Sequence, residues 1–199
     1  MVDRSFLILH GLEGSGPGHW QTWLAARLRA DNERVAYPDL PDAEMPSLHS
    51  WRERLQGELE ALPEGETVIV CHSLSCLLWL HHVAEGGAQA DRVLLVAPPS
   101  EGAEVAAIAS FLPAPLPRLS GGARLVCSDN DPYCPEGAAQ LYGEPLGIAV
   151  DLIAGGGHLN PESGYGAWPS VEAWCLDGDQ AVSVGAPERA RGSRPGSGT

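Results

Sequence analysis

The sequence predicts one α/β domain, in which a mostly parallel sheet of about six strands is covered by helices on both faces. Short apolar runs alternate with longer amphipathic stretches, the runs are almost continuously apolar, and the segment 51–59 carries apolar residues at every fourth position. Strands that are buried on both faces have this continuous apolar character, and alternating β and α segments connect parallel strands.

The expected elements follow one another as strand–helix units. Strands are expected at residues 6–9, 34–37, 67–70, 92–96, 124–127 and 149–153, and helices at 19–30, 47–62, 74–84 and 136–142. Residues 97–119 are rich in Pro and Ala, which predicts a long connection with one or two helical turns near 103–111. Ligands bind such sheets beyond the carboxyl ends of the strands, so the residues that follow each strand are candidates for chemistry.

The length of 199 residues and the 44% content of hydrophobic residues fit a single domain with a substantial core. We assign residues 1–177 to this domain. Between residues 178 and 199 the chain loses its apolar periodicity and is rich in Gly, Pro, Arg and Ser, which predicts a disordered tail.

Charge and residue content exclude several classes of function. The formal net charge of −14 argues against nucleic acids and anionic membranes as partners. All cationic residues are arginine, which excludes a P-loop lysine, a Schiff-base lysine and a Ser-Lys dyad. The N-terminal apolar run is too short for a signal peptide or a membrane span, so we expect a cytoplasmic protein in which the five cysteines are reduced.

A Gly-rich loop follows the first expected strand, in the segment HGLEGSGPGHW at residues 10–20. Its glycines fail the dinucleotide fingerprint, because the third glycine position holds His19 or Gln21, and a P-loop requires a lysine. Two interpretations remain open. The loop is a tight turn that uses glycine's access to positive φ, or it directs the backbone N–H of Leu12 into an oxyanion hole.

The third expected strand runs into VIVCHSLSCL, residues 68–77, where Ser73 occupies the serine position of a nucleophile elbow. In the G-x-S-x-G elbow, small neighbours let the strand and helix backbones approach, and the N–H after the serine, here that of Leu74, joins the oxyanion hole. Cys71 and Ser75 replace the two glycines. The alternative is that Ser73 only caps the helix that follows.

Two later loops supply a carboxylate and a histidine. The fifth expected strand runs into CSDNDPYCP, residues 127–135, in which Asp131 and Asp129 are both candidates for an orienting acid. The last expected strand runs into GGGHLNP, which places His158 after the acid. Ser73, Asp131 and His158 therefore follow the chain order of the α/β-hydrolase triad, each at the carboxyl end of an expected strand.

These segments resemble the small serine hydrolases related to retinoblastoma-binding protein nine. The similar stretches are HGLEGSGPGHWQTWL at residues 10–24, VIVCHSLSCLLWL at 68–80, LLVAPP at 94–99, CSDNDPYCP at 127–135 and GGGHLNPESGYGAWP at 155–169. The resemblance implies a three-layer α/β-hydrolase sandwich with little or no cap domain. It implies Ser73 as nucleophile, His158 as base and Asp131 rather than Asp129 as acid. Ser75 departs from the family pattern, which has glycine there.

The expected activity is carboxylesterase-like hydrolysis of a small ester, thioester or amide through an acyl-enzyme, with no metal or organic cofactor. The backbone N–H groups of Leu12 and Leu74 are expected to bind the oxyanion. The residues expected to contact the small acyl substrate are Gly11, His72, Trp20, Pro98 and Trp168.

Two other functions remain as alternatives. The first is a catalytically weak or inactive protein that serves as a binding module on the hydrolase scaffold. The second uses Cys71, His72 and Cys76 as metal ligands or as a thiol nucleophile, although a second ligand pair at recognisable spacing is missing.

Overall fold

Six parallel strands form the sheet at the centre of the molecule. The computed structural model describes residues 3–119 and 121–184. The strand order is β2-β1-β3-β4-β5-β6, and every neighbouring pair is parallel, which confirms the predicted sheet. The strands are β1 (Arg4–Leu9), β2 (Arg34–Ala36), β3 (Glu66–His72), β4 (Arg92–Val96), β5 (Gly122–Ser128) and β6 (Ala149–Ile153).

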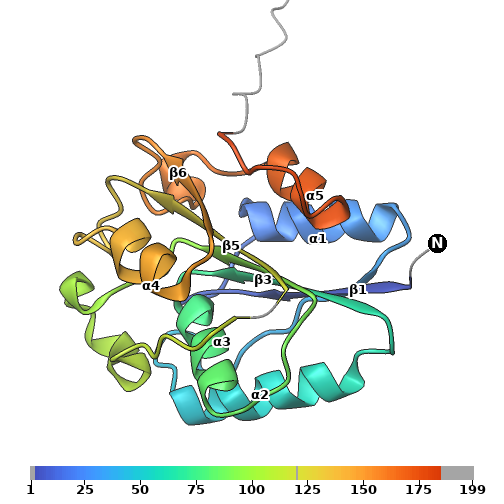
Figure 1. The fold of residues 1–199 in the computed structure, drawn as a ribbon, viewed down its shortest axis with the longest axis horizontal. Coiled ribbons are helices and arrows are strands. Elements are labelled where there is room, and N and C mark those ends of the chain that lie inside the picture. Colours follow the sequence, from blue (N-terminus) through green and yellow to red (C-terminus); the bar gives the residue numbers. More distant parts are fainter. Residues whose placement is uncertain (1–2, 120, 185–199) are drawn as a thin grey trace, which may run out of the picture.

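Helices cover both faces of the sheet, which confirms the three-layer arrangement (Figure 1). On one face lie α1 (Trp20–Ala30) and α5 (Pro169–Leu176). On the other face lie α2 (Leu48–Ala61) and α3 (Leu74–Ala84). Directly before β6, a π-helical turn at Ala139–Gly143 continues into α4 (Glu144–Leu146).

Each strand contributes side chains to both hydrophobic layers, because successive side chains of a strand point to opposite faces. In β1, Phe6 and Ile8 belong to the layer under α1 and α5, whereas Leu7 and Leu9 belong to the layer under α2 and α3. All four side chains are fully buried. The continuous apolar runs of the sequence therefore reflect a sheet that has no solvent-facing side along its centre.

The structure departs from the predicted elements in two places. Pro135 and Gly137 follow β5, and Gly137 has a φ of 93°, so the helix predicted at 136–142 begins only at Ala139. Helix α5 was not among the predicted helices, although Pro169 occupies its first turn. The turns predicted near 103–111 are confirmed as 3₁₀ helices at Glu101–Ala103 and Ala106–Phe111.

Residues 178–184 pack against the domain, so the prediction of a disordered tail from residue 178 is wrong for this stretch. Val182 is buried, and its N–H donates to Asp151 at 2.7 Å. The carbonyl of Ser183 accepts hydrogen bonds from Trp168 Nε1 and Ser170 Oγ, both at 2.7 Å. The rest of the predicted tail, residues 185–199, lies outside the described residues.

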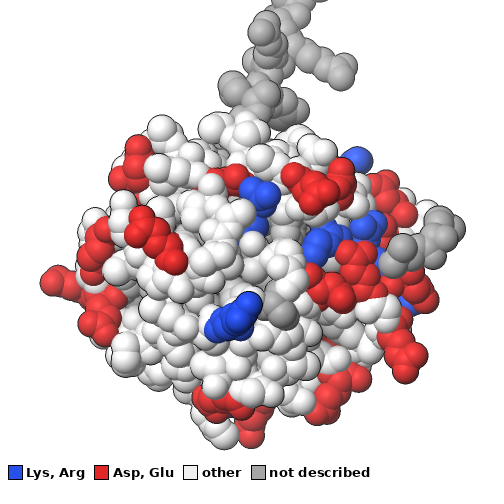
Figure 2. All heavy atoms as spheres, viewed as in Figure 1, with Lys and Arg blue, Asp and Glu red and all other residues white. Residues whose placement is uncertain are grey.

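Positive charge is paired locally on this acidic molecule. Seven arginines of the described chain contact a carboxylate: Arg4, Arg27, Arg34, Arg52, Arg54, Arg92 and Arg124. On the face shown in Figure 2, acidic side chains are spread around the periphery and arginines occur in separate small groups. Within residues 3–119 and 121–184, no helix has both the length and the apolar content needed to cross a bilayer.

Arg92 fastens the C-terminal helix to the sheet. From β4, its Nη1 donates to the carbonyl of Trp174 at 2.8 Å, and its Nη2 donates to the carbonyl of Cys175 at 2.9 Å. These carbonyls lie in the last turn of α5, where no intrahelical donor is available. Glu66 on β3 pairs with the Nε of the same guanidinium at 2.7 Å.

Replacing Arg92 with alanine is expected to lower the free energy of unfolding by about 2–3 kcal/mol, because charge-assisted hydrogen bonds are lost and two helix carbonyls lose their donor. Arg92→Lys is expected to retain only part of the lost free energy of unfolding, since a lysine ammonium lacks the two separate guanidinium nitrogens that reach both carbonyls. Urea unfolding measures the change. The matched control is Arg54→Ala, which removes an exposed ion pair on α2 and should cost about 0.5 kcal/mol or less. If both alanine variants lower the free energy of unfolding equally, Arg92 does not have the stabilising role described for it.

Candidate active site

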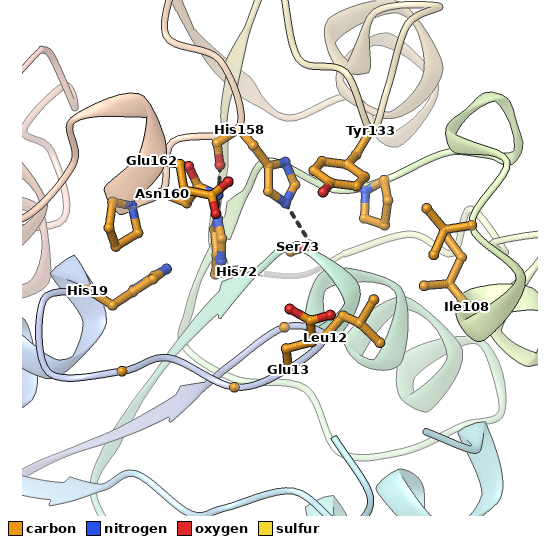
Figure 3. Close-up of a pocket in the computed structure, with 16 residues that line it drawn as sticks. Leu12, Glu13, His19, His72, Ser73, Ile108, Tyr133, His158, Asn160 and Glu162 are labelled. Atoms are coloured by element: carbon orange, nitrogen blue, oxygen red, sulfur yellow. Dashed lines mark hydrogen bonds between the residues drawn. The ribbon is translucent and has the colours of Figure 1, made fainter. Parts of the chain in front are cut away.

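A cavity opens at the carboxyl ends of β1 and β3. Strand β1 is flanked by β2 on one side and β3 on the other, so the chain leaves these two strands in opposite directions. Such a switch point is where open α/β sheets bind ligands. The cavity has a volume of about 320 Å³, and the residues on its wall include Gly11, Leu12, Ser73 and His158 (Figure 3).

Ser73 lies on a sharp turn between β3 and α3. Its φ of 56° and ψ of −124° lie in a region that costs a non-glycine residue about 1–3 kcal/mol. The turn is held by its N–H, which donates to the carbonyl of Val96 at 2.8 Å, and by its carbonyl, which accepts from the N–H of Cys76 at 2.9 Å. The Ser73 side chain forms no capping hydrogen bond, so the interpretation as a simple helix cap is wrong.

Ser75, which stands where the family pattern has glycine, connects the turn to β1. Its buried Oγ lies 2.7 Å from the carbonyl oxygen of Leu9 and 2.9 Å from that of His72. It also accepts the His72 N–H at 3.0 Å. The single hydroxyl proton can be given to one of the two carbonyls. The serine therefore satisfies buried backbone groups at the point where β1 and β3 both end.

His158 connects Ser73 to a carboxylate. The Nε2 atom of His158 lies 2.9 Å from Ser73 Oγ, and its Nδ1 atom lies 2.9 Å from each carboxylate oxygen of Asp131. Asp131 also accepts the N–H of Tyr133 at 2.9 Å. Asp129 instead accepts the N–H of Gly155 at 2.7 Å, so Asp131 is the acid that contacts the imidazole.

The loop that carries His158 is fixed from both sides. Asn130 Oδ1 accepts the N–H of Gly157 at 2.7 Å, which ties the loop to the end of β5. On the other side, Trp20 Nε1 donates to the carbonyl of Leu159 at 2.9 Å, which ties the loop to α1. The imidazole is therefore held by contacts that lie outside the cavity.

The loop after β1 approaches the Ser73 turn so closely that only glycine fits at position 11. A Cβ added to Gly11 would lie 2.7 Å from Ser73 Cβ and 3.2 Å from Ser73 Oγ. The backbone N–H groups of Leu12 and Leu74 have no acceptor within the described part of the chain. Both unpaired N–H groups belong to residues that directly follow the contact between Gly11 and Ser73, and an oxyanion hole is built from such unpaired donors.

Sequence reasoning gave His10 no role, but this side chain anchors the same loop. Its Nδ1–H donates to the carbonyl of Gly11 at 2.8 Å, and its Nε2 accepts the N–H of Leu40 at 2.8 Å. These two bonds fix a neutral tautomer. The position of His10 directly before the Gly-rich loop is the signal that could have identified it.

The structure brings only some of the predicted substrate contacts to the cavity. Gly11 and His72 line it, as does Leu12. The expectation for Trp20 and Trp168 is wrong, because both rings are fully buried and stack edge to face at 5.5 Å between α1 and α5.

Other parts of the cavity wall come from residues that were not predicted to contact the substrate. Pro98 is buried and does not line the cavity; its neighbour Pro99 does. Tyr133 and Asn160, for which no role was predicted, also line it. The Tyr133 ring lies 4.4 Å from the His158 ring, so it covers one side of the imidazole.

The interpretation of Cys71, His72 and Cys76 as one metal or thiol site is wrong. Both cysteines are buried in the layer under α2 and α3, whereas the His72 ring contacts Trp20 on the opposite face of the sheet. Burial raises the pKa of both the Cys71 and Cys76 thiols, so each remains protonated. A protonated, inaccessible thiol is a poor nucleophile and a poor ligand.

The six-stranded sheet, with a strained serine after β3 and a histidine after β6, has the α/β-hydrolase fold. The crystal structure of the ydeN gene product from Bacillus subtilis is similar, with a TM-score of 0.73, 22% identity, and coverage of 87% of this chain and 97% of that chain. Mouse alpha/beta hydrolase domain-containing protein 10 has a TM-score of 0.60, 14% identity, and coverage of 77% and 81%. The thioesterase domain from the curacin biosynthetic pathway has a TM-score of 0.63 and 16% identity, and the match covers 87% of this chain and 91% of that chain.

The chain belongs to the Serine hydrolase family, whose sequence model matches residues 6–176. YdeN of Bacillus subtilis is also similar in sequence, with 25% identity over 179 residues that cover 85% of this chain and 93% of that protein. The family match confirms the resemblance to small serine hydrolases, and the structural matches confirm the α/β-hydrolase fold.

Three buried histidines around the loop and the turn are neutral in the folded protein. Burial lowers the pKa of His10 and His72, and it lowers the pKa of His19 to about 4, with smaller contributions from the neighbouring side chains of His158 and His10. In an unfolded chain, histidine titrates near its ordinary pKa of about 6.5. The unfolded state therefore binds more protons than the folded state below this pH.

The free energy of unfolding is expected to fall as the pH is lowered through about 6.5 toward 4, because protons favour the unfolded chain in this range. Between pH 7.5 and pH 5, His19 alone should account for about 2 kcal/mol. Urea unfolding at several pH values measures the slope. The variant His19→Asn should show a shallower slope, and the exposed-histidine variant His49→Asn should not. A free energy of unfolding that stays constant across this pH range would contradict the conclusion that the buried histidines are neutral in the folded protein.

Proposed function

We propose that the protein is a serine hydrolase that cleaves small esters, thioesters or amides through an acyl-enzyme, with ester hydrolysis as its principal activity. The observation that carries this proposal is the chain of 2.9 Å hydrogen bonds from Ser73 Oγ through His158 to Asp131. Ser73 is the nucleophile, His158 the general base, and Asp131 the group that orients the imidazole. No metal or organic cofactor takes part.

In the first step, His158 Nε2 takes the Ser73 hydroxyl proton while Oγ bonds to the substrate's carbonyl carbon. Asp131 keeps the remaining imidazole proton on Nδ1 and stabilises the imidazolium. The N–H groups of Leu12 and Leu74 stabilise the oxyanion, with each donor contributing about 3 kcal/mol in comparable sites. The carbon–leaving-group bond then breaks, and His158 returns its proton to the departing atom.

In the second step, His158 activates water, which attacks the acyl-Ser73 ester. The tetrahedral intermediate collapses to release the carboxylic acid and restores the serine hydroxyl. The Tyr133 ring, 4.4 Å from the imidazole, shields one side of the base without blocking Ser73.

The altered elbow is the reason to consider a binding module without activity as an alternative. Ser73 keeps its positive φ and its hydrogen bond to His158 although Ser75 stands in place of glycine. We therefore do not propose a binding module. We propose a small-molecule acyl substrate and a cytoplasmic location, supported by five buried free cysteines, and the net charge of −14 disfavours nucleic acid and anionic membrane as partners.

Ser73→Ala is expected to abolish labelling by a fluorophosphonate probe and to lower kcat for p-nitrophenyl butyrate by about 10⁴-fold or more. Asp131→Asn should also lower kcat by about 10⁴-fold, because the imidazole loses its correct tautomer. Gel fluorescence and absorbance assays measure both effects. The matched control is Ser183→Ala, which changes an exposed serine at the end of the described chain. If the fluorophosphonate still labels Ser73→Ala to the same extent, the proposed mechanism is wrong.

Gly11→Ala is expected to reduce kcat/KM for the same ester by about a hundredfold, since the new methyl group must displace the loop whose N–H binds the oxyanion. The control is Gly18→Ala in the same loop, where an added Cβ meets no atom within 4 Å. Urea unfolding of both variants separates a local from a global effect. Equal kcat/KM values for the two variants would argue against a role of the loop in oxyanion binding.

A further inference from the structure

The cavity beside Ser73 has an apolar side and a polar side (Figure 3). On one side of the serine, the wall includes Leu12, Ile108 and Tyr133. Pro99 and Val105 also line the cavity. On the other side, the wall is formed by His19, Asn160 and Glu162. A substrate that fills both sides must join an apolar group to a polar one.

His19 presents a fixed hydrogen-bond donor on the polar side. Its residue is only 5% exposed, and its ring extends from the start of α1 toward His72 along the cavity wall. His19 Nδ1 accepts the N–H of Gln21 at 3.1 Å, which places the proton of the neutral ring on Nε2. Nε2 has no partner within the described residues. Burial holds the pKa of His19 at about 4, so the ring is neutral near pH 7.

Asn160 adds a second donor. Its Oδ1 accepts hydrogen bonds from the Ser163 N–H at 3.1 Å and from the Ser163 hydroxyl at 2.9 Å. Because the oxygen is occupied in this way, the amide nitrogen remains for a ligand, and its N–H groups have no acceptor in the described part of the chain.

The acceptors at the cavity are carboxylates. Glu13 and Glu162 are both exposed at its edge, and no arginine is among the described residues that line it. An anionic group would therefore be repelled. An alkyl group would leave the His19 N–H buried without an acceptor, which costs about 1–3 kcal/mol. An ammonium group could bind the carboxylates but could accept nothing from His19 or Asn160. A hydroxyl group both donates and accepts.

We propose, on the basis of the proposed hydrolase function, that the substrates are esters of a short apolar acyl group with a neutral, polyhydroxylated alcohol. The acyl group packs against the Leu12 and Ile108 side. The alcohol hydroxyls accept from His19 Nε2–H and the Asn160 amide and donate to Glu162.

The experiment compares two substrates of nearly equal size, glycerol 1-monobutyrate and propyl butyrate, which differ by two hydroxyl groups. For the unaltered protein, kcat/KM for the glycerol ester is expected to exceed that for the propyl ester by about tenfold or more, the effect of one or two net hydrogen bonds. Butyrylcholine, a cationic ester with the same acyl group, is expected to be a poorer substrate than the glycerol ester.

Two variants remove the donors while retaining the local structure. In His19→Asn, the shorter side chain can still cap α1 by accepting the Gln21 N–H, but it lacks the ring donor. In Asn160→Asp, a carboxylate oxygen can still accept from Ser163. Each variant is expected to bring the glycerol-to-propyl ratio of kcat/KM down by about three- to tenfold. The control is His49→Asn on the exposed surface of α2, which should keep the ratio of the unaltered protein.

The outcomes separate this inference from the proposed function. If Ser73 takes up the fluorophosphonate and p-nitrophenyl butyrate is hydrolysed, but the glycerol-to-propyl ratio is near or below one, the substrate class is wrong and the hydrolase mechanism stands. A ratio that is unchanged in both His19→Asn and Asn160→Asp, or a preference for butyrylcholine, also overturns the inference. If Ser73 is neither labelled nor needed for hydrolysis, both proposals fail.

Discussion

The arrangement of the site depends on the backbone of Ser73, which is held at a φ of 56° between a buried strand and a buried helix. Such a conformation persists only where the surroundings determine it. Here β4 accepts the Ser73 N–H, and Ser75 Oγ satisfies backbone groups of β1 and β3. The turn directs the serine hydroxyl away from its own helix and into the cavity. Gly11 fits closely against Ser73 and so brings the loop after β1 next to the same turn.

The histidines of the site have different roles because their hydrogen-bond partners differ. His10 and His19 each accept a backbone N–H, and the His72 ring donates to the carbonyl of His158 at 3.1 Å. The accepting contacts of His10 and His19 require neutral rings, and burial lowers the pKa of each of the three histidines. His158 instead contacts the buried carboxylate of Asp131. A positive charge on His158 thus has a direct counter-ion, which the other three rings lack among the described residues.

Much of the fold could be predicted because parallel strands that are buried on both faces leave continuous apolar runs. All six expected strands form, and the chain order of Ser73, Asp131 and His158 placed the three residues at one sheet edge. Helix α5 was less visible, because eight residues carry little periodicity. The helix expected at 136–142 begins only at Ala139, because Gly137 has a positive φ. A sequence does not show whether an aromatic residue faces a ligand or the core, and Trp20 and Trp168, expected at the cavity, are buried in the core.

The sequence by itself determined the layer architecture and the order of the polar loops, since hydrophobic periodicity and motif spacing are local properties. Only the tertiary structure showed that Asp131 contacts the imidazole, distinguished an elbow from a helix cap at Ser73, and revealed the unpaired donor of His19. Each of these depends on distances between residues far apart in the chain, such as the 85 positions that separate Ser73 from His158. Such distances are fixed by the packing of helices on the sheet, which no local pattern encodes.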